Sequence, residues 1–140
     1  MMKKRWISSF ILVLLLTACS SFTNKEYMQH TNVKEVLQKL QREDNSFLLL
    51  LTTNKCYSCD EYMKVIDAIQ KETPFPIYYI NVDQEDEDKL EELKIMIGHY
   101  NELPMTYYFN KGAVSQDNIK VGYVEPEVLK EWLRKLQVIE

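Results

Sequence analysis

The sequence predicts an α/β domain in which a central mixed sheet of four to five strands is flanked by helices. Apolar runs of strand length alternate with amphipathic segments of helical period, and the last two predicted strands follow each other as a hairpin. Strands joined by helices are expected to be parallel, whereas a hairpin adds antiparallel strands. With 140 residues, 46% of them hydrophobic, the chain is long enough for one packed core.

The first 18 residues are predicted to be an export signal that lies outside the fold. Lys3, Lys4 and Arg5 give a basic start, and residues 6–16 form an apolar run. This run is short for a bilayer span, but it has the length of a signal-peptide core. We therefore expect the chain to be exported.

The end of this segment, LTAC at residues 16–19, resembles the bacterial lipobox. The resemblance implies that Cys19 receives a diacylglycerol and becomes the mature N-terminus, which would hold the domain at the outer face of the cytoplasmic membrane. Residues 19–30 are then expected to be the lipidated cysteine and a polar tether, and residues 31–140 the folded domain. The alternative is an ordinary secretory signal with an incidental cysteine.

The uneven distribution of charge argues against one class of partner. Three of the 17 basic residues precede Cys19, so the remainder carries 14 basic and 21 acidic residues, a net charge of −7. Binding to nucleic-acid phosphates requires a basic surface. We therefore expect no nucleic-acid partner.

Residues 32–42 are predicted to form the first helix. Asn32 and Glu35 have capping-box spacing, and apolar residues follow at helical intervals. Three polar residues interrupt this pattern, and the continuous apolar run at 47–51 then predicts a strand covered on both faces. This strand leads directly into a segment with two cysteines.

The segment after Cys56 is predicted to be a helix with one apolar face. That face holds Cys59, Tyr62, Met63, Ile66 and Ile69. The sequence TPFP at 73–76 ends this helix, and residues 77–82 supply a second strand. These elements form a βαβ unit, so the two strands are expected to be parallel and joined by a right-handed crossover.

The second half of the chain is predicted to complete the sheet and its helical cover. Its elements are a helix opened by acidic residues 83–88 and ended by Gly98, strands at 105–109 and 119–124 with a turn at 110–112, and a helix from Pro126 to Leu136. The two strands are expected to form the hairpin.

The motif CYSC at 56–59 stands where the first predicted strand meets its helix. We expect Cys56 at the helix N-terminus, where unpaired amides and the dipole favour a negative sulfur, and Cys59 within disulfide reach. Such placement lowers the pKa of a thiol from about 8.5 to between about 3.5 and 7.5. Cys56 is therefore predicted to be the attacking nucleophile, and Cys59 the thiol that resolves the mixed disulfide.

Other interpretations of the pair are weaker. A disulfide that closes so short a loop contributes little stability. Structural zinc requires four ligands, and beyond the two thiols the mature chain offers only His30 and His99. Haem attachment requires His directly after the second cysteine, where Asp60 stands. A copper site that includes His99 stays open as an alternative.

Three motifs and the order of elements resemble the thioredoxin family over residues 32–136. CYSC occupies the position of the family's active site. Residues 103–112, LPMTYYFNKG, resemble the family segment in which a cis-proline precedes a strand and a glycine turn. Residues 121–133 resemble the closing strand and helix. The resemblance covers nearly all of the predicted mature domain.

The resemblance implies a thioredoxin-like fold and a substrate site beside the cysteines. Pro104 would be cis and face the sulfur atoms, and the Leu103 backbone would pair with an extended substrate. Tyr57 and Ser58 are expected to tune the redox potential and to contact the substrate together with Leu103 and Pro104. We expect no metal and no cofactor.

These features predict a membrane-anchored, extracytoplasmic thiol-disulfide oxidoreductase. Its expected partners are exported proteins or peptides with cysteines, a membrane protein that exchanges electrons with it, and the membrane itself through Cys19. Lys55 stands where common thioredoxins have Trp, and Leu50 where they have a buried acid, which favours a specialised exported relative. The alternative is an accessory or binding protein of the same fold, for bacteriocin disulfide maturation or for copper or haem handling.

Overall fold

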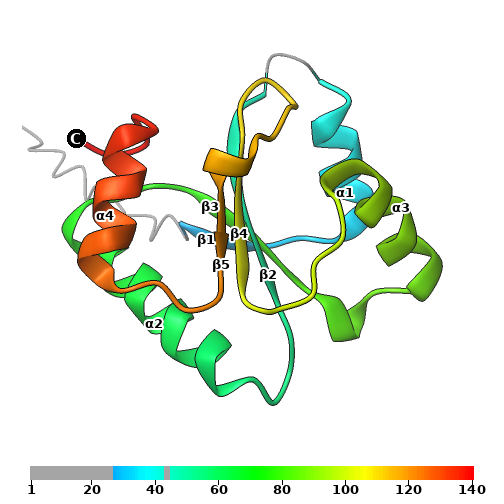
Figure 1. Ribbon diagram of the computed structural model, residues 1–140, viewed down its shortest axis with the longest axis horizontal. Helices are drawn as coiled ribbons and strands as arrows, with labels where there is room; N and C mark the ends of the chain where they lie inside the picture. Colours follow the sequence, from blue (N-terminus) through cyan, green and yellow to red (C-terminus); the bar gives the residue numbers. More distant parts are fainter. Residues whose placement is uncertain (1–26, 43–44) are drawn as a thin grey trace, which may run out of the picture.

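The computed structural model of the protein describes residues 27–42 and 45–140. Its elements are β1 (Met28–His30), α1 (Val33–Leu40), β2 (Phe47–Thr52), α2 (Tyr57–Glu72), β3 (Ile77–Asn81), the 3₁₀ turn η1 (Val82–Gln84), α3 (Glu87–Ile97), β4 (Met105–Phe109), the 3₁₀ turn η2 (Gln116–Asn118), β5 (Ile119–Val121) and α4 (Pro126–Lys135). Figure 1 shows the sheet in the centre with helices on both sides.

The five strands form one mixed sheet in the order β1-β3-β2-β4-β5. β1, β3 and β2 run parallel, whereas β4 is antiparallel to β2, and β5 is antiparallel to β4. The predicted α/β class, the parallel βαβ unit and the antiparallel hairpin are all confirmed. β2 lies in the middle of the sheet, so its carboxyl end, which leads to Cys56, is flanked by β3 and β4.

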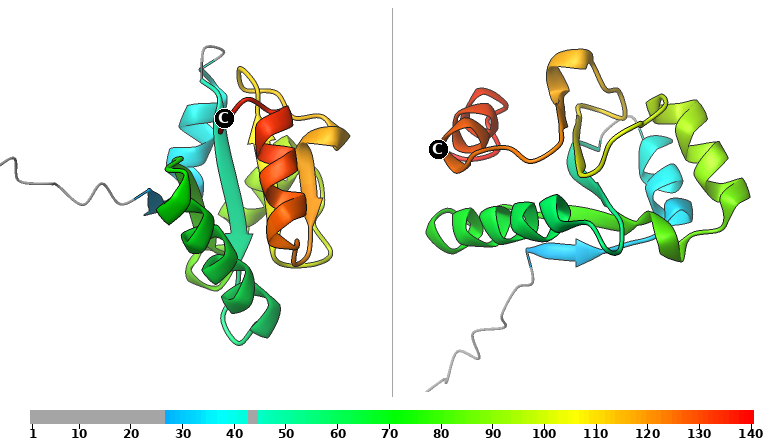
Figure 2. Two further views of the ribbon diagram at one scale, coloured as in Figure 1. Left: turned by 90° about the vertical axis from the view of Figure 1, so that its left-hand side faces the viewer. Right: turned by 60° about the horizontal axis from the view of Figure 1, so that its bottom comes forward.

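The helices cover the sheet as two pairs, α1 with α3 and α2 with α4 (Figures 1 and 2). β2 is buried on both faces because alternate side chains point to opposite sides. Leu49 and Leu51 pack in the cluster with α1 and α3, and Leu48 and Leu50 pack in the cluster with α2 and α4. The predicted double-sided burial of this strand is therefore confirmed.

Hydrogen bonds and glycines fix the ends of several elements. The Asn32 side chain accepts a hydrogen bond of 3.0 Å from the Glu35 amide and caps α1, as its spacing predicted. α3 ends at Gly98, and α4 begins at Pro126, both as predicted.

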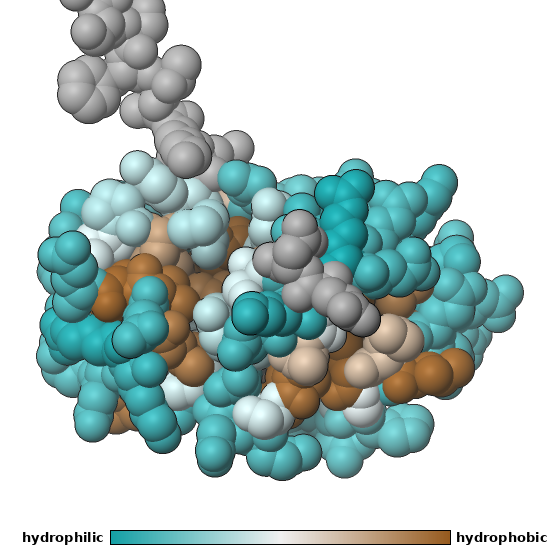
Figure 3. Space-filling model, turned by 90° about the horizontal axis from the view of Figure 1, so that it is seen from above, coloured by the Kyte–Doolittle hydropathy of each residue, from teal (hydrophilic) through white to brown (hydrophobic). Residues whose placement is uncertain are grey.

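Mostly hydrophilic residues cover the surface seen in Figure 3, where apolar residues show in patches between them.

The strand β1 was not predicted, and it lies within the segment assigned to the tether. Met28 is in register with Ile77, and the Tyr27 carbonyl accepts a hydrogen bond of 2.8 Å from the Ile77 amide. The folded domain therefore begins before residue 31. Sequence pattern missed β1 because it has only three residues, two of them polar, and so shows no alternation of its own.

Three predicted boundaries are also wrong, each for a local reason. The second strand ends at Asn81 because the Asn81 side chain accepts a hydrogen bond from the Asp83 amide and turns the chain into η1. The helix expected from residue 83 consequently begins at Glu87. The last strand ends at Val121 because Gly122, with φ of 75°, leaves the extended conformation.

The predicted export signal, Cys19 and most of the tether lie outside the described residues. Across the part of the chain that the structure describes, no helix is both long enough and apolar enough to cross a membrane. Lipid attachment at Cys19 therefore stays a prediction from the sequence.

Candidate functional site

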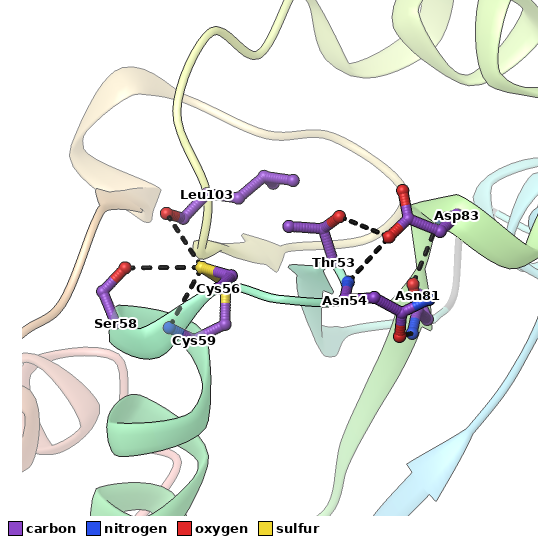
Figure 4. Close-up of a disulfide and its surroundings, with 8 residues drawn as sticks. All are labelled: Thr53, Asn54, Cys56, Ser58, Cys59, Asn81, Asp83 and Leu103. Atoms are coloured by element: carbon purple, nitrogen blue, oxygen red, sulfur yellow. Dashed lines mark hydrogen bonds between the residues drawn. A yellow bond between two sulfur atoms is a disulfide. The ribbon is translucent and has the colours of Figure 1, made fainter.

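Cys56 lies at the N-terminus of α2, after a short loop that leaves the carboxyl end of β2. It is the N-cap residue of this helix, and its Sγ accepts a hydrogen bond of 3.2 Å from the Cys59 amide (Figure 4). The Asp60 amide donates to the Cys56 carbonyl and closes the first turn. The sulfur of Cys56 therefore lies among the amides at the positive end of a helix dipole.

Cys56 and Cys59 form a disulfide, with Cα atoms 5.2 Å apart. The two cysteines differ in exposure. Cys59 is fully buried against the sheet, whereas Cys56 is partly exposed. A reactant from solvent can therefore reach Cys56 more readily than Cys59.

Two further groups lie close to the sulfur of Cys56. The Ser58 Oγ is 3.4 Å from Cys56 Sγ, and the Leu103 carbonyl oxygen is 3.9 Å from it (Figure 4). In the disulfide the sulfur carries no proton, so the Ser58 hydroxyl is the donor of the first contact. In the reduced protein a Cys56 thiol could donate to the Leu103 carbonyl, whereas a thiolate would accept from Ser58 and from the Cys59 amide.

The peptide bond between Leu103 and Pro104 is cis, and Pro104 is buried. The Pro104 carbonyl accepts a hydrogen bond of 2.8 Å from the Gly122 amide, which ties this turn to the end of β5. The sheet ladders on both sides of β4 begin only at Met105, so Leu103 lies just outside them. The structure thus brings the Leu103 carbonyl close to Cys56 Sγ, and Pro104 follows it in the cis form that the resemblance implied.

The two residues between the cysteines have different positions. Ser58 contacts the Cys56 sulfur, whereas the Tyr57 side chain is 80% exposed. Tyr57 therefore stands at the rim of the site, and Ser58 belongs to the immediate surroundings of the sulfur.

A family model for TraF, described as F plasmid transfer operon protein, matches residues 18–123. The chain belongs to the TraF family. The match spans the sequence from before β1 to just beyond β5, and so includes the CYSC motif and the segment around Pro104. No curated protein sequence matches this TraF-family chain.

Solved structures similar to this TraF-family protein include several thioredoxins. Thioredoxin f2 of Chlamydomonas reinhardtii has a TM-score of 0.61 at 11% identity, over 81% of this chain and 99% of that one. Thioredoxin of Malassezia sympodialis has a TM-score of 0.57 at 15% identity, over 77% and 89%. Chloroplastic thioredoxin z has a TM-score of 0.58 at 13% identity, over 79% and 94%. At these identities the likeness establishes a thioredoxin-like fold.

A thioredoxin-like fold with a disulfide-bonded CxxC pair indicates a thiol-disulfide redox function for the TraF-family protein. For a metal site, the described residues contain no group of three or more His, Cys, Asp or Glu side chains that could hold an ion. His99, considered for copper, is an exposed residue of the segment that follows α3.

Below the cysteines the TraF-family protein has a buried pair of hydroxyl groups. By the resemblance given above, Leu50 stands where common thioredoxins have a buried acid. It is fully buried and in register with Thr106. The Thr106 Oγ1 donates a hydrogen bond of 3.1 Å to the Tyr62 hydroxyl, one helical turn beyond Cys59. Burial raises the pKa of Tyr62 to about 12 despite this hydrogen bond. This tyrosine is therefore neutral throughout the physiological range.

Sequence reasoning missed Asp83, which it assigned to the solvated start of a helix. Its carboxylate instead accepts hydrogen bonds from the loop that precedes Cys56, at Thr53 and Asn54. A signal for this contact was present. Because parallel strands end at the same edge of a sheet, the polar residues that follow β2 and β3 meet there.

Proposed function

We propose that this protein is a membrane-anchored thiol-disulfide oxidoreductase that acts on disulfides of exported proteins. The observation that carries the proposal is the unequal placement of two bonded cysteines: Cys56 is partly exposed at a helix N-terminus, and Cys59 is buried behind it. Helix amides stabilise a thiolate at the first position, and burial protects the second thiol until a mixed disulfide has formed.

In the reducing direction, the Cys56 thiolate attacks one sulfur of a client disulfide. A bond forms between Cys56 and that sulfur, and the other client sulfur leaves as a thiolate. Cys59 then loses its proton and attacks Cys56 Sγ, which restores the disulfide of the structure and releases the second client thiolate. The client gains two electrons and two protons, and the dithiol of the protein loses them. In the oxidising direction the same steps run in reverse.

The geometry of the turn at Leu103 and Pro104 supports the proposal that the client chain binds beside it. The Leu103 carbonyl lies 3.9 Å from Cys56 Sγ and precedes the sheet ladders, so an extended client segment beside it would hold its sulfur next to Cys56. Tyr57, at the exposed rim, is proposed to contact the same client. Ser58 is proposed to donate to the Cys56 thiolate.

Membrane attachment is proposed from the sequence LTAC, in which Cys19 would carry the lipid at the extracytoplasmic face. Reducing or oxidising equivalents would then come from a membrane protein with its own cysteine pair. Cys19→Ser should abolish incorporation of labelled fatty acid and release the protein from the membrane fraction, while the purified domain keeps its redox activity. Unchanged lipid labelling would rule out Cys19 as the anchor.

Trapping tests the chemistry directly. Cys59→Ser should accumulate mixed disulfides with client proteins, because the resolving thiol is absent, whereas Cys56→Ser should trap none. The purified wild-type protein should also reduce insulin or oxidise a reduced model protein. If Cys56→Ser kept full activity, the assignment of the nucleophile would be wrong.

The TraF family description, which names a plasmid transfer operon protein, favours a second candidate, an accessory protein that serves a few dedicated clients and not a general oxidoreductase. Under this candidate the Cys59→Ser variant traps only a few proteins, and insulin turnover is slow. A wide range of trapped proteins would favour the general oxidoreductase. A protein that traps none, but keeps a stoichiometric metal through gel filtration, would instead be a metal-binding relative.

A further inference from the structure

The loop of three residues that leads into Cys56, Thr53 to Lys55, has a conformation that needs external support. Lys55, directly before the nucleophile, has φ of 53°, in the left-handed region that non-glycine residues seldom adopt. Such a residue keeps this conformation only where the surrounding structure over-determines it. Contacts from outside the loop can supply this support.

A single carboxylate oxygen from outside the loop accepts hydrogen bonds from two of its three residues. Oδ2 of Asp83 accepts one hydrogen bond of 2.7 Å from the Thr53 hydroxyl and another of 2.7 Å from the Asn54 amide (Figure 4). Asp83 belongs to η1, which follows the neighbouring strand β3. The carboxylate thus joins the segment after β3 to the segment after β2.

Asn81 extends this connection on both sides. Its Nδ2 donates a hydrogen bond of 2.8 Å to Asn54 Oδ1, and its Oδ1 accepts one of 3.1 Å from the Asp83 amide. Asn81 is also the register partner of Thr52, the last residue of β2. The side chain of Asn81 therefore fixes both Asp83 and the loop that Asp83 holds.

We propose that Asp83 is a positioning residue for Cys56, because it fixes the loop through which the chain enters α2. Held in this way, Cys56 takes the extended N-cap conformation, with φ of −115° and ψ of 100°, that turns its sulfur toward the Cys59 amide. Without Asp83 the loop at Lys55 can relax, and the sulfur loses its alignment with the helix amides. The role rests on the proposed function, in which Cys56 is the attacking sulfur.

The charge of Asp83 and its support of the loop should have opposite effects on the pKa of Cys56, so the two effects can be separated. Hydrogen bonds from Thr53 and from the Asn54 amide, with a smaller effect from the charge of Lys55, hold the pKa of Asp83 below its usual range, so the carboxylate is ionised at neutral pH. A negative charge near a thiol disfavours the thiolate. If charge alone mattered, removal of Asp83 would lower the pKa of Cys56. If position matters, removal raises it.

The test measures the thiolate of Cys56 in reduced protein, by its ultraviolet absorbance against pH and by its rate of reaction with iodoacetamide below its pKa. Asp83→Ala should raise the pKa of Cys56 by about one unit and slow alkylation about tenfold. Asp83→Asn should stay near the wild-type rate, because one amide oxygen can accept both hydrogen bonds that Oδ2 accepts. This rescue distinguishes positioning from charge.

Asp86 provides a matched control. It is an exposed acid three residues further on, at the N-cap of α3, and has no side-chain hydrogen bond to that helix. Asp86→Ala should leave the rate of Cys56 alkylation within about twofold of the wild-type value, since the hydrogen bonds to Thr53 and Asn54 come from Asp83 and the charge of an exposed acid is screened by salt. An equal effect of both alanine variants would contradict the proposal.

A second variant covers the case in which Asp83→Ala does not fold. Thr53→Val removes one of the two donors and keeps the shape of the side chain, so it should slow alkylation about threefold. An unchanged or lowered pKa of Cys56 in Asp83→Ala, or an unchanged rate in a folded Thr53→Val, would overturn the proposal. Alkylation needs no client protein, so the positioning role can fail or hold whether or not mixed disulfides are trapped.

Discussion

The Thr106 hydroxyl donates a hydrogen bond of 3.1 Å to the Tyr62 hydroxyl, and both side chains are buried. Tyr62 lies on α2, one turn after Cys59, and Thr106 lies on β4, two residues after Pro104. This hydrogen bond therefore joins the helix that carries the cysteines to the strand that follows the cis peptide bond. It therefore holds together the two elements that carry the residues of the candidate site.

Loss of either hydroxyl should destabilise the fold. Tyr62→Phe and Thr106→Val each leave a buried polar group without its partner, which costs about 1–3 kcal/mol in the free energy of unfolding. The double variant should cost less than the sum of the two, with a coupling energy of about 1 kcal/mol, because no orphaned group remains. Urea unfolding of the four proteins measures this coupling. Additive costs would show that the contact contributes nothing of its own.

Stability should fall at alkaline pH because of buried tyrosines. Burial raises the pKa of Tyr62 and of Tyr107 from 10.0 to about 12. Below the lower value both residues are neutral in both states, whereas between these values the unfolded chain ionises and the folded protein does not. The free energy of unfolding should therefore decrease from about pH 10 toward about pH 12. Urea unfolding across this range should show a shallower decrease in Tyr62→Phe than in the wild type.

The Ser58 hydroxyl should stabilise the Cys56 thiolate, because its Oγ lies 3.4 Å from Cys56 Sγ. Ser58→Ala should slow alkylation of Cys56 about threefold and make the couple more reducing by about 15 mV, since the reduced form loses a donor. Equilibration with a glutathione buffer measures the potential. Ser58→Thr keeps the hydroxyl, so it should stay near the wild-type potential. A wild-type potential in Ser58→Ala would contradict this role.

Only one sulfur should react readily in the folded, reduced protein. Cys56 is partly exposed and Cys59 is fully buried, so a short exposure to iodoacetamide should label Cys56 and leave Cys59 unmodified. Peptide mass spectrometry measures the two yields. In denaturant both cysteines should label at similar rates, which controls for intrinsic reactivity. Preferential labelling of Cys59 in the folded protein would require a different nucleophile.

The turn between β4 and β5 should tolerate no side chain at Gly112. With φ of 78°, Gly112 is in the left-handed region, and a Cβ there would lie 2.7 Å from the Leu40 carbonyl oxygen at the end of α1. Gly112→Ala should therefore cost more than about 1 kcal/mol of stability. Gly122, with φ of 75° and nothing within 4 Å of such a Cβ, is the matched control. Gly122→Ala shares the backbone cost without the clash, so equal losses would exclude the clash.

Much of the fold could be predicted because single segments carry strong local patterns. The run at residues 47–51 is apolar at every position, as a strand buried on both faces requires, and β2 is that strand. The cysteine pair and the Leu103–Pro104 segment could also be recognised in the sequence, because redox chemistry requires cysteine and a cis peptide bond favours proline. These patterns indicated the two cysteines and the segment whose Leu103 carbonyl lies 3.9 Å from Cys56 Sγ.

The rest depends on contacts between segments that are distant in sequence. β1 has three residues and is a strand only because β3 offers it a parallel partner. Asp83 looks like any acidic residue before a helix, and its contact with Thr53 exists only because β2 and β3 end side by side. No pattern within one segment indicates such a contact, which could be expected only by considering the ends of the two predicted parallel strands together.

The direction of β1 also has a practical consequence. β1 runs parallel to β2 and β3, and Met28, where the described chain enters the sheet, is in register with Ile77, at the ends of these strands that point away from Cys56. Anything joined upstream of Met28, whether an acyl chain, a purification tag or an electrode linker, therefore meets the domain on its far side. Immobilisation through that end would leave the sulfur atoms facing the bulk solution.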